Sequence, residues 1–356
     1  MLHRISMALA LLAIMPCTGA FAAEAEPAPV PATAPCAAGA LPDGAAERSF
    51  AVAGWPDRDY DLALPPAHRC GVPLAVVVVF HGGGGNKENM RKITCPGGDL
   101  ASDGCLDRVA RAAGMAVVFA NGTASRGGGI ISRGGIRTWN AGGGRDGYIC
   151  ASGPACTSAV DDVAYTRALL ADLSHRIEVD GRRVYATGFS NGAAMAHRLA
   201  CEAADRFAAI APVGGQNQFA LAGCTPAARI AVLDIHGTLD RCWPYEGGEG
   251  GCLASGRYVS VAETLAGWAA RNGCEATPER TTLPPRAAVN DGTQVVRLAY
   301  RGCTRGSVEH LQVVGNGHYW PDGHAYARPR LLGGAMSHQL DTARAMVAFF
   351  AANAKP

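Results

Sequence analysis

Residues 183–200 have the sequence RVYATGFSNGAAMAHRLA. The apolar start predicts a buried strand, and the alanine-rich end has the apolar spacing of a helix. Between them stands Gly-x-Ser-x-Gly, the pattern that exposes a nucleophilic serine on a sharp strand-to-helix turn. We therefore expect strained backbone at Ser190. We also expect glycine to be required at Gly188 and Gly192, because neighbouring segments would pass too close for a side chain.

Further strands and helices are predicted on both sides of this turn. Continuous apolar runs, typical of strands buried on both faces of a sheet, occur at residues 74–80 (LAVVVVF), 115–120, 184–187, 207–213 and 230–235. Helical apolar spacing occurs at residues 162–177, 193–203, 261–271 and 342–352. Strands that alternate with helices predict an α/β fold, with a mostly parallel central sheet flanked by helices.

The nucleophilic serine needs a base and an acid that orients the base. In this architecture the chain order is Ser, then Asp or Glu, then His, with each residue on a loop after a strand. Asp240 follows the predicted strand 230–235, and His318 lies on a glycine-rich turn after the strand-like residues 308–314. Asp234 is a rival acid, but it lies inside its strand. We predict Ser190, Asp240 and His318 as the catalytic residues.

An acyl-transfer intermediate also needs backbone N–H donors for its oxyanion. We predict one donor at Asn191, directly after the serine, and the other at Gly83 in the sequence HGGGGN of residues 81–86. A phosphate-binding loop is the alternative for these glycines, because Lys87 follows them. The spacing of that motif requires glycine where Asn86 stands, which argues against it.

Three tryptophans lie on loops expected around the site. Their aromatic faces suit sugar or hydroxycinnamoyl rings, with simple loop packing as the alternative; they are Trp139, Trp243 and Trp320. Trp139 belongs to the glycine-rich segment 121–160, which has no clear period and is expected to close over a small acyl group. We expect His236 to be a hydrogen-bonded packing residue.

Composition and the N-terminus limit the class of protein. Lys and Arg number 32 against 30 Asp and Glu, a net charge of +2, which argues against a strongly basic nucleic-acid surface. Residues 1–22 resemble a signal peptide, and no later apolar run approaches the ~20 residues of a membrane span. Residues 23–47 are rich in Ala and Pro, as in a tail or linker. We predict one catalytic domain over residues 48–356, in a secreted or periplasmic protein.

Cysteine usage supports export. Of 13 cysteines, Cys17 lies in the predicted signal peptide, and the remaining even number predicts disulfides. Short loops make Cys95/Cys105, Cys150/Cys156 and Cys242/Cys252 plausible pairs, although spacing alone leaves the connectivity open. No Cys-x-x-Cys pair or His-rich cluster is present, so we expect neither a metal nor another cofactor.

Several motifs together resemble the bacterial polyhydroxybutyrate depolymerase/feruloyl esterase family, α/β-hydrolases related to carbohydrate esterase family 1. The motifs are HGGGG (81–85), VDDVAYTRALL (160–170), GFSNGAAM (188–195), IHGTLD with Pro-Tyr (235–245) and GNGHYWP (315–321). The resemblance covers nearly all of residues 58–350. It implies a triad of Ser190, Asp240 and His318, with Gly83 and Asn191 lining the oxyanion hole. The arginine- and glycine-rich loop 121–147 departs from the family pattern and leaves the substrate open.

The expected activity is that of a serine carboxylic ester hydrolase acting through an acyl-enzyme. The expected substrates are small or oligomeric hydroxycinnamoyl (feruloyl-type) or hydroxyalkanoate esters, with acetylated xylan as an alternative. A serine peptidase of the same fold commonly carries a propeller or a large cap, which this sequence lacks. A non-catalytic binding protein has no need of the complete Ser, Asp and His set. No nucleic acid or obligate protein partner is expected.

Overall fold

The computed structural model describes residues 39–124, 136–142, 154–218, 223–251, 256–326 and 329–356. Internal contacts divide the chain into residues 1–33 and 34–356, and all described residues belong to the second unit. The predicted signal peptide and much of the glycine-rich segment lie outside the described residues. The boundaries predicted at residues 22 and 47 stay predictions.

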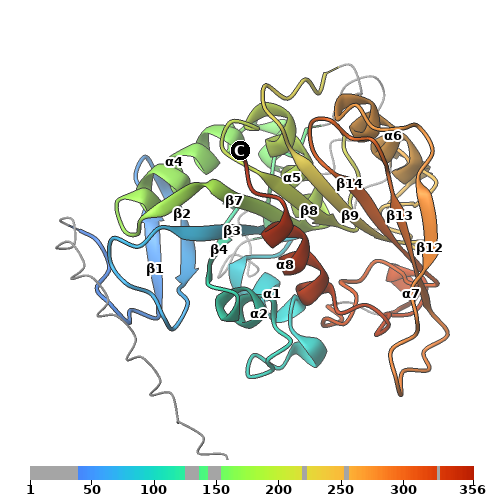
Figure 1. The fold of residues 1–356 in the computed structure, drawn as a ribbon, viewed down its shortest axis with the longest axis horizontal. Helices are drawn as coiled ribbons and strands as arrows, with labels where there is room; N and C mark the ends of the chain where they lie inside the picture. Colours follow the sequence, from blue (N-terminus) through green and yellow to red (C-terminus); the bar gives the residue numbers. More distant parts are fainter. Residues whose placement is uncertain (1–38, 125–135, 143–153, 219–222, 252–255, 327–328) are drawn as a thin grey trace, which may run out of the picture. The chain divides into compact units, whose positions relative to one another are not determined.

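A ten-stranded sheet runs through this unit (Figure 1), in the order β1-β2-β4-β3-β7-β8-β9-β14-β13-β12. Its centre, from β4 to β14, is parallel, and antiparallel strands extend both edges. This confirms the predicted α/β class. The strands are β1 (Glu47–Val52), β2 (Trp55–Ala63), β3 (Leu74–Phe80), β4 (Met115–Ala120), β7 (Val179–Phe189), β8 (Ala209–Val213), β9 (Ala231–Gly237), β12 (Glu279–Thr282), β13 (Gln294–Ala299) and β14 (Val308–Val314).

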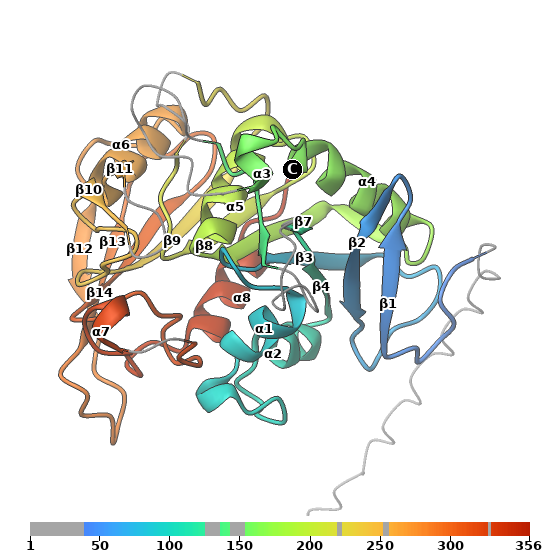
Figure 2. The ribbon, with the colours of Figure 1, turned by 180° about the vertical axis from the view of Figure 1, so that it is seen from behind.

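Helices cover both faces of the sheet, as Figures 1 and 2 show. One side carries α4 (Asp162–Ser174), α5 (Asn191–Glu202) and α6 (Val261–Arg271), and the other α1 (Lys87–Ile93), α2 (Leu106–Ala112) and α8 (Thr342–Ala352). The remaining described elements are short: β5 (Thr123–Ala124), β6 (Arg137–Thr138), β10 (Gly248–Gly250), β11 (Gly256–Tyr258), η1 (Pro96–Gly98), α3 (Pro154–Thr157) and α7 (Pro329–Leu332).

Strand β3 explains why its sequence is apolar without interruption. Successive side chains of a strand point to opposite faces of the sheet. Val76 and Val78 pack into the core beneath α4, α5 and α6, whereas Val77 and Val79 pack beneath α1, α2 and α8. All seven residues of β3 are buried.

Disulfides brace the described part of the chain. The predicted bridge Cys95–Cys105 is present, together with Cys201–Cys224 and Cys274–Cys303. The cysteines Cys70, Cys156 and Cys242 are also disulfide-bonded. The expected partners of two of them, Cys150 and Cys252, lie outside the described residues, so those two pairings stay predictions.

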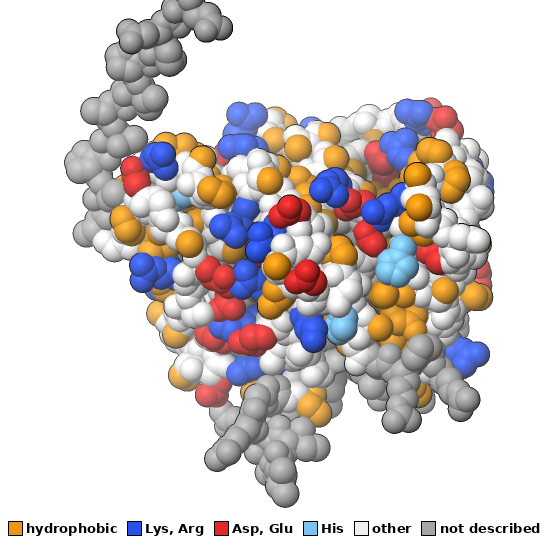
Figure 3. Space-filling view, turned by 90° about the horizontal axis from the view of Figure 1, so that it is seen from below, with side chains coloured by type: hydrophobic (Ala, Val, Ile, Leu, Met, Phe, Trp, Pro, Cys, Tyr) orange, Lys and Arg blue, Asp and Glu red, His pale blue; other side chains and the backbone are white. Residues whose placement is uncertain are grey.

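The surface charge and the helices are relevant to two classes of protein, those that bind nucleic acid and those that span a membrane. Figure 3 shows acidic and basic side chains interspersed on the face that it draws, without a large patch of one sign. Among the described residues, no helix combines the length and the apolar character that crossing a bilayer requires.

Candidate active site

Ser190 occupies the sharp turn between β7 and α5. Its backbone lies at φ 58° and ψ −119°, a conformation that L-residues adopt only under constraint. A Cβ at Gly188 would lie 2.4 Å from the carbonyl oxygen of Gly192, and a Cβ at Gly192 would lie 2.2 Å from that of Phe80. These separations are far below van der Waals contact, so both positions require glycine, as the sequence predicts.

The structure brings Ser190, His318 and Asp240 into one line of hydrogen bonds. Ser190 Oγ lies 2.9 Å from His318 Nε2, and His318 Nδ1 lies 2.7 Å from Asp240 Oδ2. Asp240 follows β9, and His318 follows β14. All three residues are buried, with exposed fractions of 8% or less. A hydroxyl, an imidazole and a carboxylate in this order can move a proton off the serine oxygen.

The carboxylate of Asp240 is held on both oxygens. Oδ1 accepts hydrogen bonds from the backbone N–H groups of Cys242 and Trp243, each at 2.8 Å. Burial raises the pKa of Asp240, but the charge of His318 and hydrogen bonds from His236 and His318 outweigh burial and lower that pKa to about 2. Asp240 is therefore ionised at neutral pH, as an orienting acid must be.

His236 is closer to this machinery than its sequence position suggested. Its Nε2 lies 2.9 Å from the carbonyl oxygen of Trp243 and 3.3 Å from Asp240 Oδ2. Burial lowers the pKa of His236, but its contact with Asp240 outweighs burial and raises the pKa. The expected packing role is therefore joined by a direct contact with the acid. The available signal was its position at the end of β9, four residues before Asp240.

The rival acid Asp234 belongs to a separate buried cluster. Asp234 Oδ2 lies 2.8 Å from His310 Nδ1, and Oδ1 lies 3.7 Å from His197 Nε2. Burial opposes ionisation of Asp234, but its contacts with His197 and His310 outweigh burial and lower its pKa. The preference for Asp240 over Asp234 as the partner of His318 agrees with this geometry.

The glycine turn after β3 packs directly against Ser190 and Asn191. A Cβ at Gly82 would lie 3.4 Å from Ser190 Cβ, and one at Gly83 would lie 3.5 Å from Asn191 Cβ. Gly83 N–H has no hydrogen-bond partner among the described residues. Asn191 begins α5, and the first N–H groups of a helix lack intrahelical acceptors and carry partial positive charge. Two segments that bear amide donors therefore meet beside the serine.

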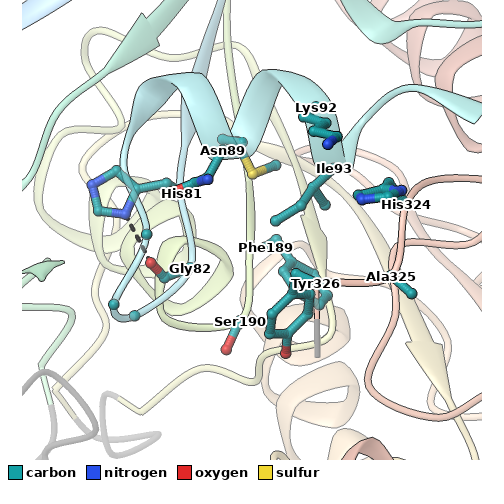
Figure 4. Close-up of a pocket in the computed structure, with 14 residues that line it drawn as sticks. His81, Gly82, Asn89, Lys92, Ile93, Phe189, Ser190, His324, Ala325 and Tyr326 are labelled. Carbon is teal, nitrogen blue, oxygen red and sulfur yellow. Dashed lines mark hydrogen bonds between the residues drawn. The ribbon is translucent and has the colours of Figure 1, made fainter. Parts of the chain in front are cut away.

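A cavity of ≈ 360 Å³ opens beside Ser190. Figure 4 shows α1 along one wall and residues 324–326 along another. Its larger side chains are Met90, Ile93, Phe189 and Tyr326, which are apolar or aromatic, and His81, Asn89, Lys92 and His324, which are polar. No described lining residue is Asp or Glu. The volume falls in the range of small-molecule sites and exceeds what an acetyl group fills.

The three predicted substrate-contacting tryptophans do not line this cavity. Trp139, Trp243 and Trp320 are 0%, 3% and 1% exposed. Trp243 lies beside Asp240 through its backbone, and Trp320 packs in the core beneath α8. The geometry therefore favours the packing alternative for all three. The lining residues of α1 and of 324–326 were not predicted from the sequence, because their residue types carry no distinctive chemical signal.

Two groups of described side chains have atoms close enough to suggest a metal site. They are Cys95, Cys105 and Asp107, and Asp240, Cys242 and His318. All three cysteines are disulfide-bonded, so none offers the thiolate that a metal binds. Asp240 and His318 are hydrogen-bonded to each other.

The chain is 31% identical to the putative esterase NocK of Nocardia uniformis subsp. tsuyamanensis, over 98% of this chain and 97% of that protein. It is 34% identical to feruloyl esterase B of Piromyces equi, over 36% of this chain and 25% of that protein. No family model matches the chain.

Among solved structures, the acetyl xylan esterase of Aspergillus awamori matches with a TM-score of 0.50 at 15% identity. The match covers 77% of this chain and 94% of that one, and at this identity it shows a shared fold. The likeness to NocK runs the full length of both proteins at more than 30% identity, and it accompanies the motifs and the fold described above. The chain therefore belongs to the polyhydroxybutyrate depolymerase/feruloyl esterase family of α/β-hydrolases.

Proposed function

We propose that this chain hydrolyses carboxylic esters through an acyl-enzyme formed on Ser190. The observation that carries the proposal is the line of hydrogen bonds from Ser190 Oγ through His318 to Asp240, at 2.9 Å and 2.7 Å. A serine hydroxyl is a weak nucleophile without a base, and the hydrogen bonds of His318 to Ser190 and to the ionised carboxylate of Asp240 support its role as that base. The names of the relatives, an esterase and a feruloyl esterase, agree with this chemistry.

Each group has a defined role in the proposed reaction. Ser190 Oγ attacks the ester carbonyl carbon as His318 Nε2 takes its proton. Amides of Gly83 and Asn191 stabilise the oxyanion, and His318 then protonates the departing alcohol. Water activated by His318 attacks the acyl-enzyme and releases the acid. Asp240 holds the imidazole in the tautomer with the proton on Nδ1 and stabilises its positive charge.

The cavity supports an acyl group with an aromatic ring. Phe189 and Tyr326 offer ring surface beside Ser190, with their ring centroids 5.6 Å apart. Asn89, Lys92 and His324 supply hydrogen-bond donors that suit the phenolic oxygen of a hydroxycinnamoyl group. Hydroxycinnamoyl esters are therefore the first candidate substrates, and short hydroxyalkanoate esters are the second. An acetyl group would leave most of the cavity unfilled, which ranks acetylated xylan below both.

Export is part of the proposal. Disulfides form and persist mainly in oxidising compartments, and those of the described residues support a secreted or periplasmic protein. Residues 1–22 would then be removed as a signal peptide, leaving the tail 23–47 and the catalytic domain 48–356. A mature N-terminus near residue 23, measured by mass spectrometry of the exported protein, tests this part.

Active-site titration with a serine-reactive phosphonate tests the chemistry. We expect one equivalent to label Ser190, with loss of activity on methyl ferulate, and no labelling of Ser190→Ala. A panel of methyl ferulate, hydroxybutyrate oligomers and acetylated xylan then ranks the substrates. Labelling without turnover of any ester would favour the binding-protein alternative, and cleavage of peptides in preference to esters would favour a peptidase.

A further inference from the structure

One buried residue bonds to both segments that carry the proposed oxyanion donors. The indole Nε1–H of Trp139 donates to the carbonyl oxygen of His81 at 2.9 Å. The backbone of Trp139 forms a two-way pair with the side chain of Asn191: Trp139 N–H donates to Oδ1 at 2.8 Å, and Nδ2 donates to the Trp139 carbonyl at 3.0 Å. Trp139 is 0% exposed, so no water competes for these bonds.

We propose that Trp139 is a positioning residue that sets the location of Gly83 relative to Asn191. His81 stands two residues before Gly83, and Asn191 carries the other proposed donor. The two segments come from distant parts of the chain, and Trp139 bonds to each of them. This inference rests on the proposed function, because it assigns Trp139 a role in the oxyanion hole of that reaction.

Other bonds to the glycine turn hold it on both sides of Gly83. Gly84 N–H donates to the carbonyl oxygen of Arg137 at 2.9 Å, two residues before Trp139. Before Gly83, His81 Nδ1 lies 2.8 Å from the carbonyl oxygen of Gly82, and His81 Nε2 accepts from Gly122 N–H at 3.0 Å. Because an amide N–H only donates, Nε2 is the acceptor and Nδ1 carries the proton. Gly84 N–H and Gly85 N–H are thus bonded within the protein, whereas Gly83 N–H has no partner among the described residues.

Trp139 is itself fixed on its other side. The guanidinium carbon of Arg58 lies 5.1 Å from the Trp139 ring centroid and 3.4 Å from that of Tyr165. Arg58 Nη1 lies 2.5 Å from Asp162 Oδ1, and Phe80 meets the indole edge-on at 4.9 Å. Cation–π and ion-pair contacts in this dry surrounding leave the indole little room to shift. A rigid residue of this kind can hold two loops at one separation.

The separation matters because an oxyanion needs both donors at about 2.7–3.1 Å. Misplacement of reacting groups by about 1 Å can cost a factor on the order of 10² in rate. Loss of the Trp139 bonds should therefore act on the transition state, which carries the oxyanion, and much less on the ground-state ester, whose carbonyl carries little charge.

Trp139→Phe tests this role, because phenylalanine keeps an aromatic ring but cannot donate to His81. We expect kcat for an aryl ester to fall by about 10- to 100-fold with KM within about threefold. Trp268→Phe is the matched control: Trp268 is equally buried and donates its Nε1–H to His197 at 3.1 Å, away from Gly83 and Asn191. The control should lose a similar amount of stability and keep its kcat.

Asn191→Ala is the second variant. It keeps Cβ beside Gly83 but removes both bonds to the Trp139 backbone, so kcat should fall as in Trp139→Phe. Each variant removes hydrogen bonds from the same connection between His81, Trp139 and Asn191. The kcat of the double variant should therefore fall by less than the product of the two single-variant losses. This coupling also keeps the inference testable if one single variant folds poorly.

A thionoester substrate provides a readout that general destabilisation does not move. Its sulfur accepts hydrogen bonds weakly, so the wild type should prefer the oxygen ester strongly, and Trp139→Phe should show a smaller preference. If the wild type hydrolyses esters but Trp139→Phe keeps the kcat and the oxygen-to-sulfur preference of Trp268→Phe, this inference is wrong and the proposed function stands. If the wild type hydrolyses no ester, the proposed function itself fails.

Discussion

At the residue scale, His318 has contacts to both other members of the proposed triad. His318→Ala should lower kcat by a factor on the order of 10⁴ or more, close to the loss in Ser190→Ala, because triad members act as a unit. Asp240→Asn should also cause a large loss, because an amide nitrogen facing His318 Nδ1 would favour the wrong tautomer. Steady-state kinetics with circular dichroism as a folding control measure both effects. More than about a tenth of the activity left in His318→Ala would remove it as the base.

The burial of His81 leads to a prediction about how the free energy of unfolding changes in acid. Burial lowers the pKa of His81 to about 3, and the charges of Arg137 and Arg58 add to this effect against the hydrogen bond to Gly82. The unfolded chain binds a proton to His81 below about pH 6.5, whereas the folded chain does not until about pH 3. His81 therefore makes the free energy of unfolding fall as pH drops through this window.

The comparison that isolates this effect is wild type against His81→Asn. The variant should be less stable at pH 7, because it loses bonds within the glycine turn. Its free energy of unfolding should decline less steeply than the wild-type value between pH 6.5 and pH 4. Denaturant titrations at several pH values measure both slopes, and parallel slopes would contradict the assignment of a neutral, buried His81.

At the scale of elements, the turn from β7 to α5 depends on close backbone approach. Gly188→Ala would place its Cβ 2.4 Å from the Gly192 carbonyl oxygen, which is backbone and has little freedom to yield. We expect a loss of about 3 kcal/mol or more in the free energy of unfolding, in line with strained core substitutions. Gly181→Ala, in the same strand, meets nothing within 4 Å and should leave the protein nearly unchanged. Thermal denaturation of both variants makes the comparison.

The same elements show how far sequence reasoning reaches. The apolar run of β3 predicts a strand buried on both faces, because such burial leaves an uninterrupted apolar pattern. The Gly-x-Ser-x-Gly pattern predicts a turn at Ser190 that requires glycine at positions 188 and 192. The cavity wall at Asn89 and Lys92 could not be predicted in this way. Residues of a short helix such as α1 acquire a role only when a loop distant in sequence packs opposite them. Trp139 was assigned to the right region, but its partners His81 and Asn191 became apparent only from the assembled fold.

At the scale of the whole molecule, disulfides connect helices and loops outside the sheet. The bridges Cys95–Cys105, Cys201–Cys224 and Cys274–Cys303 span 10, 23 and 29 residues. Removal of a native disulfide typically costs about 2–5 kcal/mol, so full reduction should lower Tm strongly. A calorimetric scan with and without reductant measures this shift, and the paired Cys95→Ser, Cys105→Ser variant should show part of it. An unchanged Tm after verified reduction of all bridges would refute the prediction.

The three residues of the hydrogen-bonded line lie far apart along the chain. Ser190 and His318 are separated by 128 positions, and Asp240 and His318 by 78. Each follows a different parallel strand, β7, β9 or β14, so the line exists only when the neighbouring strands β7, β8, β9 and β14 have paired in register. Pairing between parallel strands forms slowly, because long loops must close before the contacts that reward closure. During refolding, ester hydrolysis should consequently report the last stage of folding. Activity should begin only after the spectroscopic signals of helix and sheet have reached their final values.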